Sequence, residues 1–225
     1  YLCMPEKATV ALKPGNTTYE EAAAIPYGSL TALNLLRAVD IRPGDTVLIN
    51  GASGGIGSFA VQLAKHFGAE VTGVCGTPRV EYVRSLGADH VLDYTRDDFT
   101  EGDTKYQVVF EVLGKSSFSQ CRRMLAPQGR YLLASYKMKQ ILQMLWTKIC
   151  GGQRVICGLS TEDQDDLEHI RELVEKGAVQ AFIHKRFPLE QTAEVLDFSL
   201  ATIKRDWEFT KAWLRREISR ESQGF

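Results

Sequence analysis

The sequence lacks the usual marks of metal-binding, disulfide-stabilised and strongly charged proteins. Its 225 residues include five cysteines and four histidines, with no CxxC pair and no histidine at the spacing of a zinc ligand. We therefore expect free thiols in a reducing compartment, the cytoplasm, and no metal site. Lysine and arginine nearly balance aspartate and glutamate, 27 against 28, so the chain as a whole offers no basic surface for nucleic acid.

An apolar run long enough to cross a bilayer is also missing. The strongest candidate, residues 141–149, is too short and is accompanied by Lys137, Lys139 and Lys148. We therefore expect no membrane partner, and we expect this segment to be buried against a partner or a further domain.

A glycine-rich turn is the most informative feature that is present. Gly51 and Ala52 permit a tight turn, Gly54 and Gly55 would let the backbone approach a pyrophosphate, and Gly57 would allow close packing of a helix on a strand. A helix that starts here directs unpaired N–H groups at such a ligand. The glycines alone are also compatible with an ordinary strand-to-helix turn.

The flanking sequence favours the phosphate site. Residues 46–49 form an apolar run typical of a buried parallel strand, residues 56–67 have apolar positions at helical spacing, and Gly68 is placed to end that helix. A second apolar run follows at 71–74. The segment 45–75 is therefore predicted to be one βαβ unit of about thirty residues.

The alternation of strands and helices continues along the chain and predicts a doubly wound, parallel α/β sheet. Phe118, Cys121, Met124 and Leu125 are predicted to share a helical face, and residues 127–129 are predicted to break the chain before a strand. The further predicted strands are 90–94, 106–110, 130–134 and 154–158, with a short helix at 82–86 and another helix through Ile170, Leu173 and Val174. Ligands of such sheets bind at the carboxyl ends of the strands.

The end of the second strand indicates which dinucleotide is bound. NAD-binding folds usually place an acidic residue there, whereas residues 74–79 contain none. Thr77 can donate a hydrogen bond and Arg79 can supply positive charge to a 2′-phosphate, so NADP is favoured over NAD. The alternatives are that Arg79 is a solvated residue at the start of the next helix and that Cys75 is a small apolar space-filler.

Four segments, residues 20–26, 51–57, 86–91 and 93–94, resemble the medium-chain dehydrogenase/reductase superfamily, in particular its zinc-free quinone oxidoreductase-like branch. The resemblance extends over residues 1–194. It implies a Rossmann domain and hydride transfer between NADPH and a small-molecule quinone, enone or other carbonyl compound. The cofactor-binding residues expected from the turn and from this resemblance are Ala52, Ser53, Gly54, Gly55 and Ile56 at the pyrophosphate, Cys75, Gly76, Thr77 and Arg79 at the adenosine phosphate, Tyr94 at the adenosine, and Val112, Leu113 and Gly114 at the nicotinamide.

The chain departs from the resembled family at both ends. The resemblance implies a preceding barrel-like catalytic domain, which we expect to be largely missing here; residues 1–30 are expected to be its remnant and a linker, and 31–187 the Rossmann domain. No catalytic acid or base can be assigned. Tyr27 and Thr31 approach the nicotinamide in relatives, but core packing is the favoured role for both. The resemblance leaves a homodimer open.

The tail, residues 188–225, is expected to be a helical appendage. Its segment 192–217 resembles the helix-turn-helix of bacterial extracytoplasmic-type sigma factors, which suggests a truncated or chimeric chain. We do not expect this remnant alone to bind DNA, because Asp206 and Glu208 dilute its positive charge. The alternative function is a nucleotide-binding regulator whose C-terminal helices contact DNA or a partner protein.

Overall fold

The computed structural model describes residues 9–161 and 163–183. Within them, Val10–Phe182 form one compact unit. The sigma-factor-like segment, the end of the predicted Rossmann domain and the first residues of the predicted remnant lie outside the described residues. Those expectations, and the division into domains, stay predictions.

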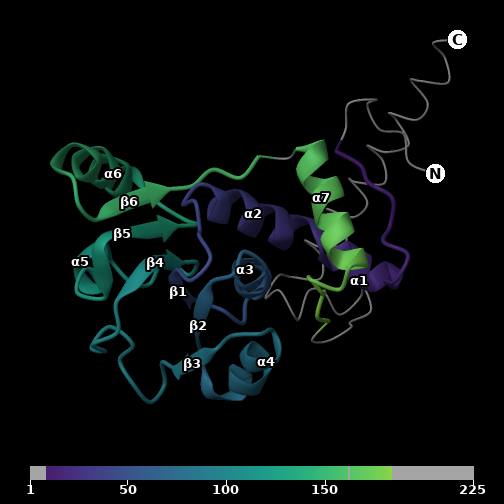
Figure 1. The fold of residues 1–225 in the computed structure, drawn as a ribbon, viewed down its shortest axis with the longest axis horizontal. Coiled ribbons are helices and arrows are strands. Elements are labelled where there is room, and N and C mark those ends of the chain that lie inside the picture. The colour runs from purple at the N-terminus through teal and green to yellow at the C-terminus, as the bar shows by residue number, and fades with distance from the viewer. Residues whose placement is uncertain (1–8, 162, 184–225) are drawn as a thin grey trace, which may run out of the picture. The chain divides into compact units, whose positions relative to one another are not determined.

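A single sheet of six parallel strands forms the centre of the unit, in the order β3-β2-β1-β4-β5-β6 (Figure 1). This is the order of a doubly wound Rossmann sheet, and it confirms the predicted fold class. The strands are β1 (Thr46–Asn50), β2 (Glu70–Cys75), β3 (His90–Asp93), β4 (Tyr106–Glu111), β5 (Leu125–Leu133) and β6 (Arg154–Cys157).

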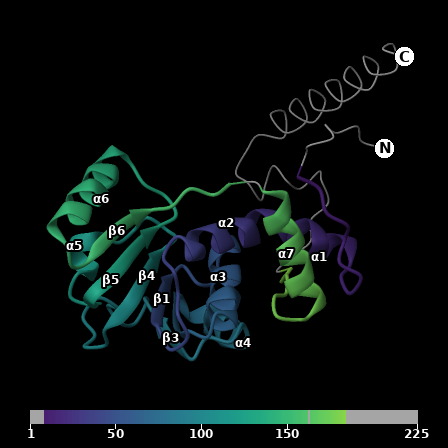
Figure 2. The ribbon, with the colours of Figure 1, turned by 45° about the horizontal axis from the view of Figure 1, so that its top comes forward.

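Helices cover both faces of this sheet. Figures 1 and 2 show α3 and α4 on one face and α5 and α6 on the other. The helices are α1 (Tyr19–Ala24), α2 (Pro26–Arg37), α3 (Gly55–His66), α4 (Val80–Ser85), α5 (Phe118–Cys121), α6 (Met138–Cys150) and α7 (Gln164–Glu175), with a short 3₁₀ helix η1 (Thr77–Arg79) before α4.

Two hydrophobic cores form because successive side chains of a strand point to opposite faces. In β1, Val47 and Ile49 pack into the core beneath α2 and α3, whereas Leu48 packs into the core on the α5 side. In β4, Val108 joins the first core and Val109 the second. This explains why the strands read as continuous apolar runs in the sequence.

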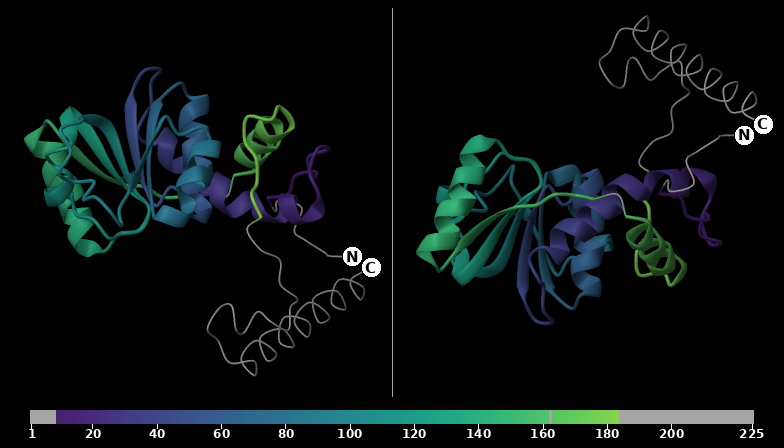
Figure 3. Two further views of the ribbon diagram at one scale, coloured as in Figure 1. Left: turned by 90° about the horizontal axis from the view of Figure 1, so that it is seen from below. Right: turned by 90° about the horizontal axis from the view of Figure 1, so that it is seen from above.

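Polar contacts attach α7 to α2 outside the sheet. The side chain of Asn34 donates a hydrogen bond to Asp166 at 2.8 Å, and Arg37 forms an ion pair with the same carboxylate. Figure 3 shows α7 next to the N-terminal helices from two sides. Asp166 in the first turn of α7 therefore pairs with one cation and one amide of α2, in addition to its favourable place at the positive end of its own helix.

The predicted helical face at 118–125 is wrong in its second half. Helix α5 ends at Cys121, and Leu125 already belongs to β5, where it pairs with Tyr106 of β4. The predicted break at 127–129 is an irregularity inside β5, since the register shifts between Tyr106 and Val108. Pairing with the neighbouring strand has overridden the local helical spacing.

Helix α6 exposes an apolar stripe in the described unit. Met138, Trp146 and Ile149 are 69%, 63% and 84% exposed, and Leu142 and Leu145 are also exposed. The expectation that this segment is covered by a partner or a further domain stays a prediction. Among the described helices, none combines the length and apolar character that a membrane-spanning segment requires.

Helix α3 packs against the glycine turn so closely at Gly57 that a side chain there would collide with the backbone. A Cβ added to Gly57 would lie 2.0 Å from the carbonyl oxygen of Gly51, a backbone atom that cannot rotate away. We expect Gly57→Ala to lower the free energy of unfolding by about 1–3 kcal/mol, because α3 must move off the turn. Urea unfolding of the ligand-free protein measures this loss.

Gly55→Ala is the matched control, since it lies in the same helical turn and its Cβ would meet no atom within 4 Å. We expect it to change the free energy of unfolding by less than about 1 kcal/mol, in the stabilising direction. Equal losses in the two variants would contradict the close approach.

Candidate functional site

The glycine-rich turn lies between the end of β1 and the start of α3 and is held by the end of β2. The backbone N–H groups of Gly51 and Ala52 both donate to the carbonyl oxygen of Val74 at 3.1 Å. Gly51 has a φ of 92°, which favours glycine, and Gly54 donates back to the carbonyl of Gly51 at 3.1 Å. The turn is therefore fixed before any ligand arrives.

The start of α3 is open. Gly54 occupies the N-cap position with extended backbone, and no side chain caps the helix. The first N–H groups of α3 therefore have no acceptor within their own helix, and Gly55 has free space where a Cβ would stand. Together with the helix dipole, this arrangement suits an anion that needs close access to the backbone.

At the end of β2, the predicted residues Gly76 and Tyr94 come together. A Cβ added to Gly76 would lie 3.1 Å from the hydroxyl oxygen of Tyr94, whose side chain is exposed at the end of β3. Cys75 is buried beside them, and burial raises the pKa of its thiol, with a further increase from the charge of Asp93. Its thiol is thus a poor nucleophile, in keeping with a space-filling role.

Thr77 is adjacent to a carboxylate that sequence reasoning did not foresee. Its hydroxyl donates to Asp93 at 2.5 Å, and Asp93 also accepts from the backbone N–H of Thr95 at 3.0 Å. The hydrogen bonds from the Thr77 and Thr95 hydroxyls hold the pKa of Asp93 below its usual value, so the group is an anion at neutral pH. The segment 74–79 contains no acidic residue, but β3 brings one next to it.

Arg79 is the last residue of η1 and the N-cap of α4. Its backbone N–H donates to the carbonyl oxygen of Gly76 at 2.9 Å, and Arg79 as a whole is partly buried. The charge of Arg79 also acts on Tyr82 of α4, although burial is the larger effect and raises the pKa of that phenol. Arg79 and Thr77 thus belong to the same short helix, η1.

The loop after β4 closes the other side of the turn. Val112 donates to the carbonyl of Asn50 at 3.1 Å, and Leu113 lies over Gly51, where a Cβ would approach the Leu113 Cγ to 2.8 Å. Gly114 has a φ of 67°. The loop predicted at the nicotinamide thus lies against the glycine turn at Gly51, as expected for the carboxyl ends of adjacent parallel strands.

Glu111 is the residue at this edge that sequence reasoning missed. It is fully buried and accepts a hydrogen bond from the side-chain amide of Asn50 at 2.8 Å. The available signal was a charged residue at the end of an otherwise apolar strand, since a buried carboxylate persists only when it is hydrogen-bonded.

Tyr27 and Thr31 do not take the expected role in the core. Tyr27 is 80% exposed, so core packing is wrong for this residue. Thr31 is partly buried and uses its hydroxyl to donate to the Tyr27 carbonyl at 2.8 Å within α2. The reason is their helical position, because the buried side of α2 is taken by its leucines.

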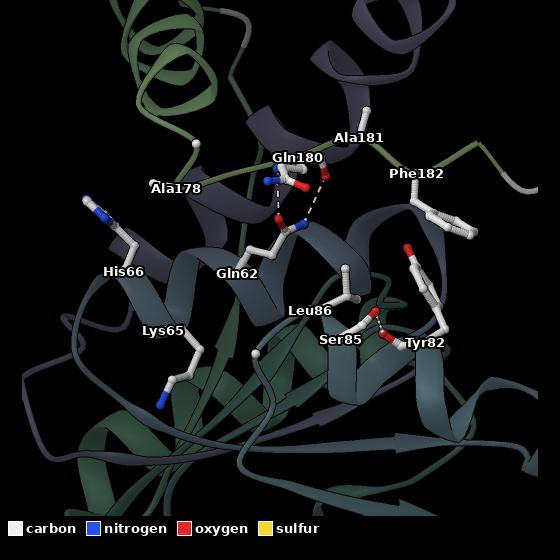
Figure 4. Close-up of a pocket in the computed structure, with 12 residues that line it drawn as sticks. Gln62, Lys65, His66, Tyr82, Ser85, Leu86, Ala178, Gln180, Ala181 and Phe182 are labelled. Atoms are coloured by element: carbon white, nitrogen blue, oxygen red, sulfur yellow. Dashed lines mark hydrogen bonds between the residues drawn. The ribbon is translucent and has the colours of Figure 1, made fainter. Parts of the chain in front are cut away.

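A distinct hollow of about 460 Å³ lies elsewhere, between α3, α4 and residues 177–182 (Figure 4). Gln62 spans it by exchanging hydrogen bonds with the backbone of Gln180 at 3.1 and 2.8 Å, and the rings of Tyr82 and Phe182 stand 4.4 Å apart. None of the predicted cofactor residues lines it. In residues 9–161 and 163–183, no group of three or more histidine, cysteine or acidic side chains is arranged to hold a metal ion.

Comparison with known proteins agrees with this geometry. Residues 55–176, more than half of the chain, match the family described as zinc-binding dehydrogenase. The chain is 40% identical over 111 residues to the NADPH-dependent alkenal/one oxidoreductase of Arabidopsis thaliana, covering 48% of this chain and 29% of that protein. It is 31% identical over 207 residues to the chloroplast envelope quinone oxidoreductase homolog of the same plant, covering 84% of this chain and 60% of the relative.

A solved structure, the quinone oxidoreductase of Coxiella burnetii, superposes with a TM-score of 0.73 at 25% identity, over 83% of this chain and 60% of that one. The chain thus spans only part of the length of the relatives that it matches. The parallel sheet, the glycine turn and these matches together show that the chain belongs to the medium-chain dehydrogenase/reductase family.

Proposed function

We propose that this chain is the dinucleotide-binding part of an NADPH-dependent oxidoreductase of the quinone oxidoreductase-like branch. The observation that carries the proposal is the uncapped start of α3, held against a glycine turn with open space at Gly55. Reduced NADP supplies a hydride to an electrophilic carbon when it is bound. The substrate class that we propose is a small quinone, enone or related carbonyl compound, in line with the names of the relatives.

In this proposal, each end of the cofactor meets a different strand end. The amides of residues 53–56 would hold the pyrophosphate, and Gly76 and Tyr94 would receive the adenosine. Arg79 would supply the positive charge for the 2′-phosphate, while Thr77 already donates its hydroxyl to Asp93. The carboxylate of Asp93 beside Thr77 repels a phosphate dianion, so a positive charge is needed to offset it. We therefore propose Arg79 as the source of the preference for NADP.

Arg79→Ala tests the cofactor assignment. We expect the unaltered chain to bind NADPH more tightly than NADH, and the variant to lose about tenfold in NADPH affinity with little change for NADH, because one charge-assisted contact is removed. Isothermal titration calorimetry with both cofactors measures the difference. Equal affinities for the two cofactors in the unaltered chain would contradict the assignment.

Gly54→Asp tests the phosphate cradle. The backbone of Gly54 is extended, with φ −82° and ψ 175°, so aspartate fits there and would cap α3 with its own carboxylate. We expect the free energy of unfolding to stay level or rise by about 0.5 kcal/mol. We expect NADPH affinity to fall about a hundredfold, because the new carboxylate occupies the helix N–H groups and repels the pyrophosphate.

Gly54→Ala is the control for this change, since it adds the same Cβ without a charge. We expect it to lose far less NADPH affinity than the aspartate variant. If both variants bind NADPH alike, the uncapped helix start is not where the phosphates bind.

The reaction itself is tested by following NADPH oxidation with a panel of quinones and enones. We expect the protein to oxidise NADPH in the presence of at least one member of the panel and Gly54→Asp to abolish that oxidation. Oxidation that is unaffected by Gly54→Asp would contradict the proposal, because it would arise outside the cradle.

A further inference from the structure

The buried carboxylate of Glu111 accepts hydrogen bonds from three backbone amides of the loop after β4. Its side chain is 0% exposed. One oxygen, Oε1, accepts from the backbone N–H groups of Leu113 at 3.0 Å and Lys115 at 3.4 Å. The other, Oε2, accepts from the side-chain amide of Asn50 at 2.8 Å and from the N–H of Ser116 at 3.2 Å, and the Ser116 hydroxyl donates to it as well.

These contacts connect the two halves of the proposed site. Asn50 is the last residue of β1, directly before the glycine turn, and it pairs in register with Glu111 across the sheet. Leu113, whose N–H is held by Glu111, lies over Gly51. The carboxylate therefore holds the loop in its place over the turn.

The loop is supported from below by a second buried side chain. The hydroxyl of Tyr131 donates to the carbonyl oxygen of Ser116 at 2.9 Å, and burial raises the pKa of this phenol. Tyr131 is 1% exposed and packs against Phe118 with ring centroids 5.9 Å apart. Tyr131 thus supports the loop from one side, and the buried carboxylate of Glu111 binds its backbone amides.

We propose that Glu111 is a positioning residue: it sets the backbone of residues 112–116 so that the loop can receive the nicotinamide end of the cofactor. This inference rests on the proposed function. Because both carboxylate oxygens are occupied by donors of the loop and of Asn50, Glu111 acts through that backbone. The loop amides that it binds are turned inward, toward the buried carboxylate.

Glutamine cannot replace this carboxylate. Whichever oxygen becomes an NH₂ group, that group faces either two backbone donors, Leu113 and Lys115, or the donors of Asn50 and Ser116. Opposed donors in a buried site are costly, so the loop is expected to leave its place.

Glu111→Gln is therefore tested with two ligands, NADPH and 2′,5′-ADP, which lacks the nicotinamide half. We expect calorimetry to show a loss of at least about tenfold for NADPH and less than about twofold for 2′,5′-ADP. Glu70→Gln is the control, the same change at the opposite edge of the sheet, at the start of β2, which β1 separates from β4, and we expect it to alter neither affinity. Amide hydrogen exchange is expected to speed up at Leu113, Lys115 and Ser116 and to stay slow in β1.

Several results would overturn the inference. One is a parallel loss of both ligands, which would indicate general destabilisation, and another is unchanged NADPH affinity. If the unaltered chain binds 2′,5′-ADP as tightly as NADPH, the nicotinamide half adds no affinity and Glu111 has no ligand to position. The proposed phosphate site would be unaffected by that result. If it binds neither ligand, the proposed function fails first and the inference with it.

If Glu111→Gln does not fold, Ser116→Ala provides the same test, since it removes one donor and leaves the carboxylate in place. We expect it to weaken NADPH about threefold, with no change for 2′,5′-ADP. Equal effects on the two ligands would again count against a positioning role.

Discussion

The contact between the start of α3 and the end of β1 is the constraint on which the rest of the unit depends. Gly57 lies against the carbonyl of Gly51 at a separation that leaves no room for a Cβ. Helix α2 adds a second contact of this kind, because a Cβ on Gly28 would stand 2.4 Å from the carbonyl of Gly55. Two helices therefore converge on one turn, and the backbone stays exposed at Gly55. This arrangement suits a bulky anion, because no side chain stands in its way at Gly55.

The parallel sheet turns this local contact into an extended site. Since all six strands run in the same direction, their carboxyl ends share one edge, and residues distant in sequence become neighbours. Tyr94 reaches Gly76 and Leu113 reaches Gly51 in this way. Buried or half-buried carboxylates at the same edge, Glu111 and Asp93, hold the loops in place through hydrogen bonds. The edge thus combines open backbone at Gly55 with two carboxylates, Glu111 and Asp93, that already accept hydrogen bonds from the protein.

Membership of the medium-chain dehydrogenase/reductase family gives this edge its chemical context. The family match covers residues 55–176, which contain α3, the five strands after it and the loop that follows Glu111. The chain spans 60% of the quinone oxidoreductase homolog that it resembles. Tyr27 and the apolar stripe of α6 are exposed in the described unit. Most residues of the proposed nucleotide site therefore fall inside the matched part of the chain.

The sequence by itself determined the order of strands and helices and the position of the glycine turn, because hydrophobic periodicity and glycine spacing are local properties. Only the tertiary structure decided which strand ends meet. It placed Asp93 beside Thr77 and made Leu125 a strand residue, through its pairing with Tyr106. It also buried Glu111 among loop amides. Such contacts depend on strand pairing across distant segments, and no local pattern in one sequence encodes the partner of a carboxylate.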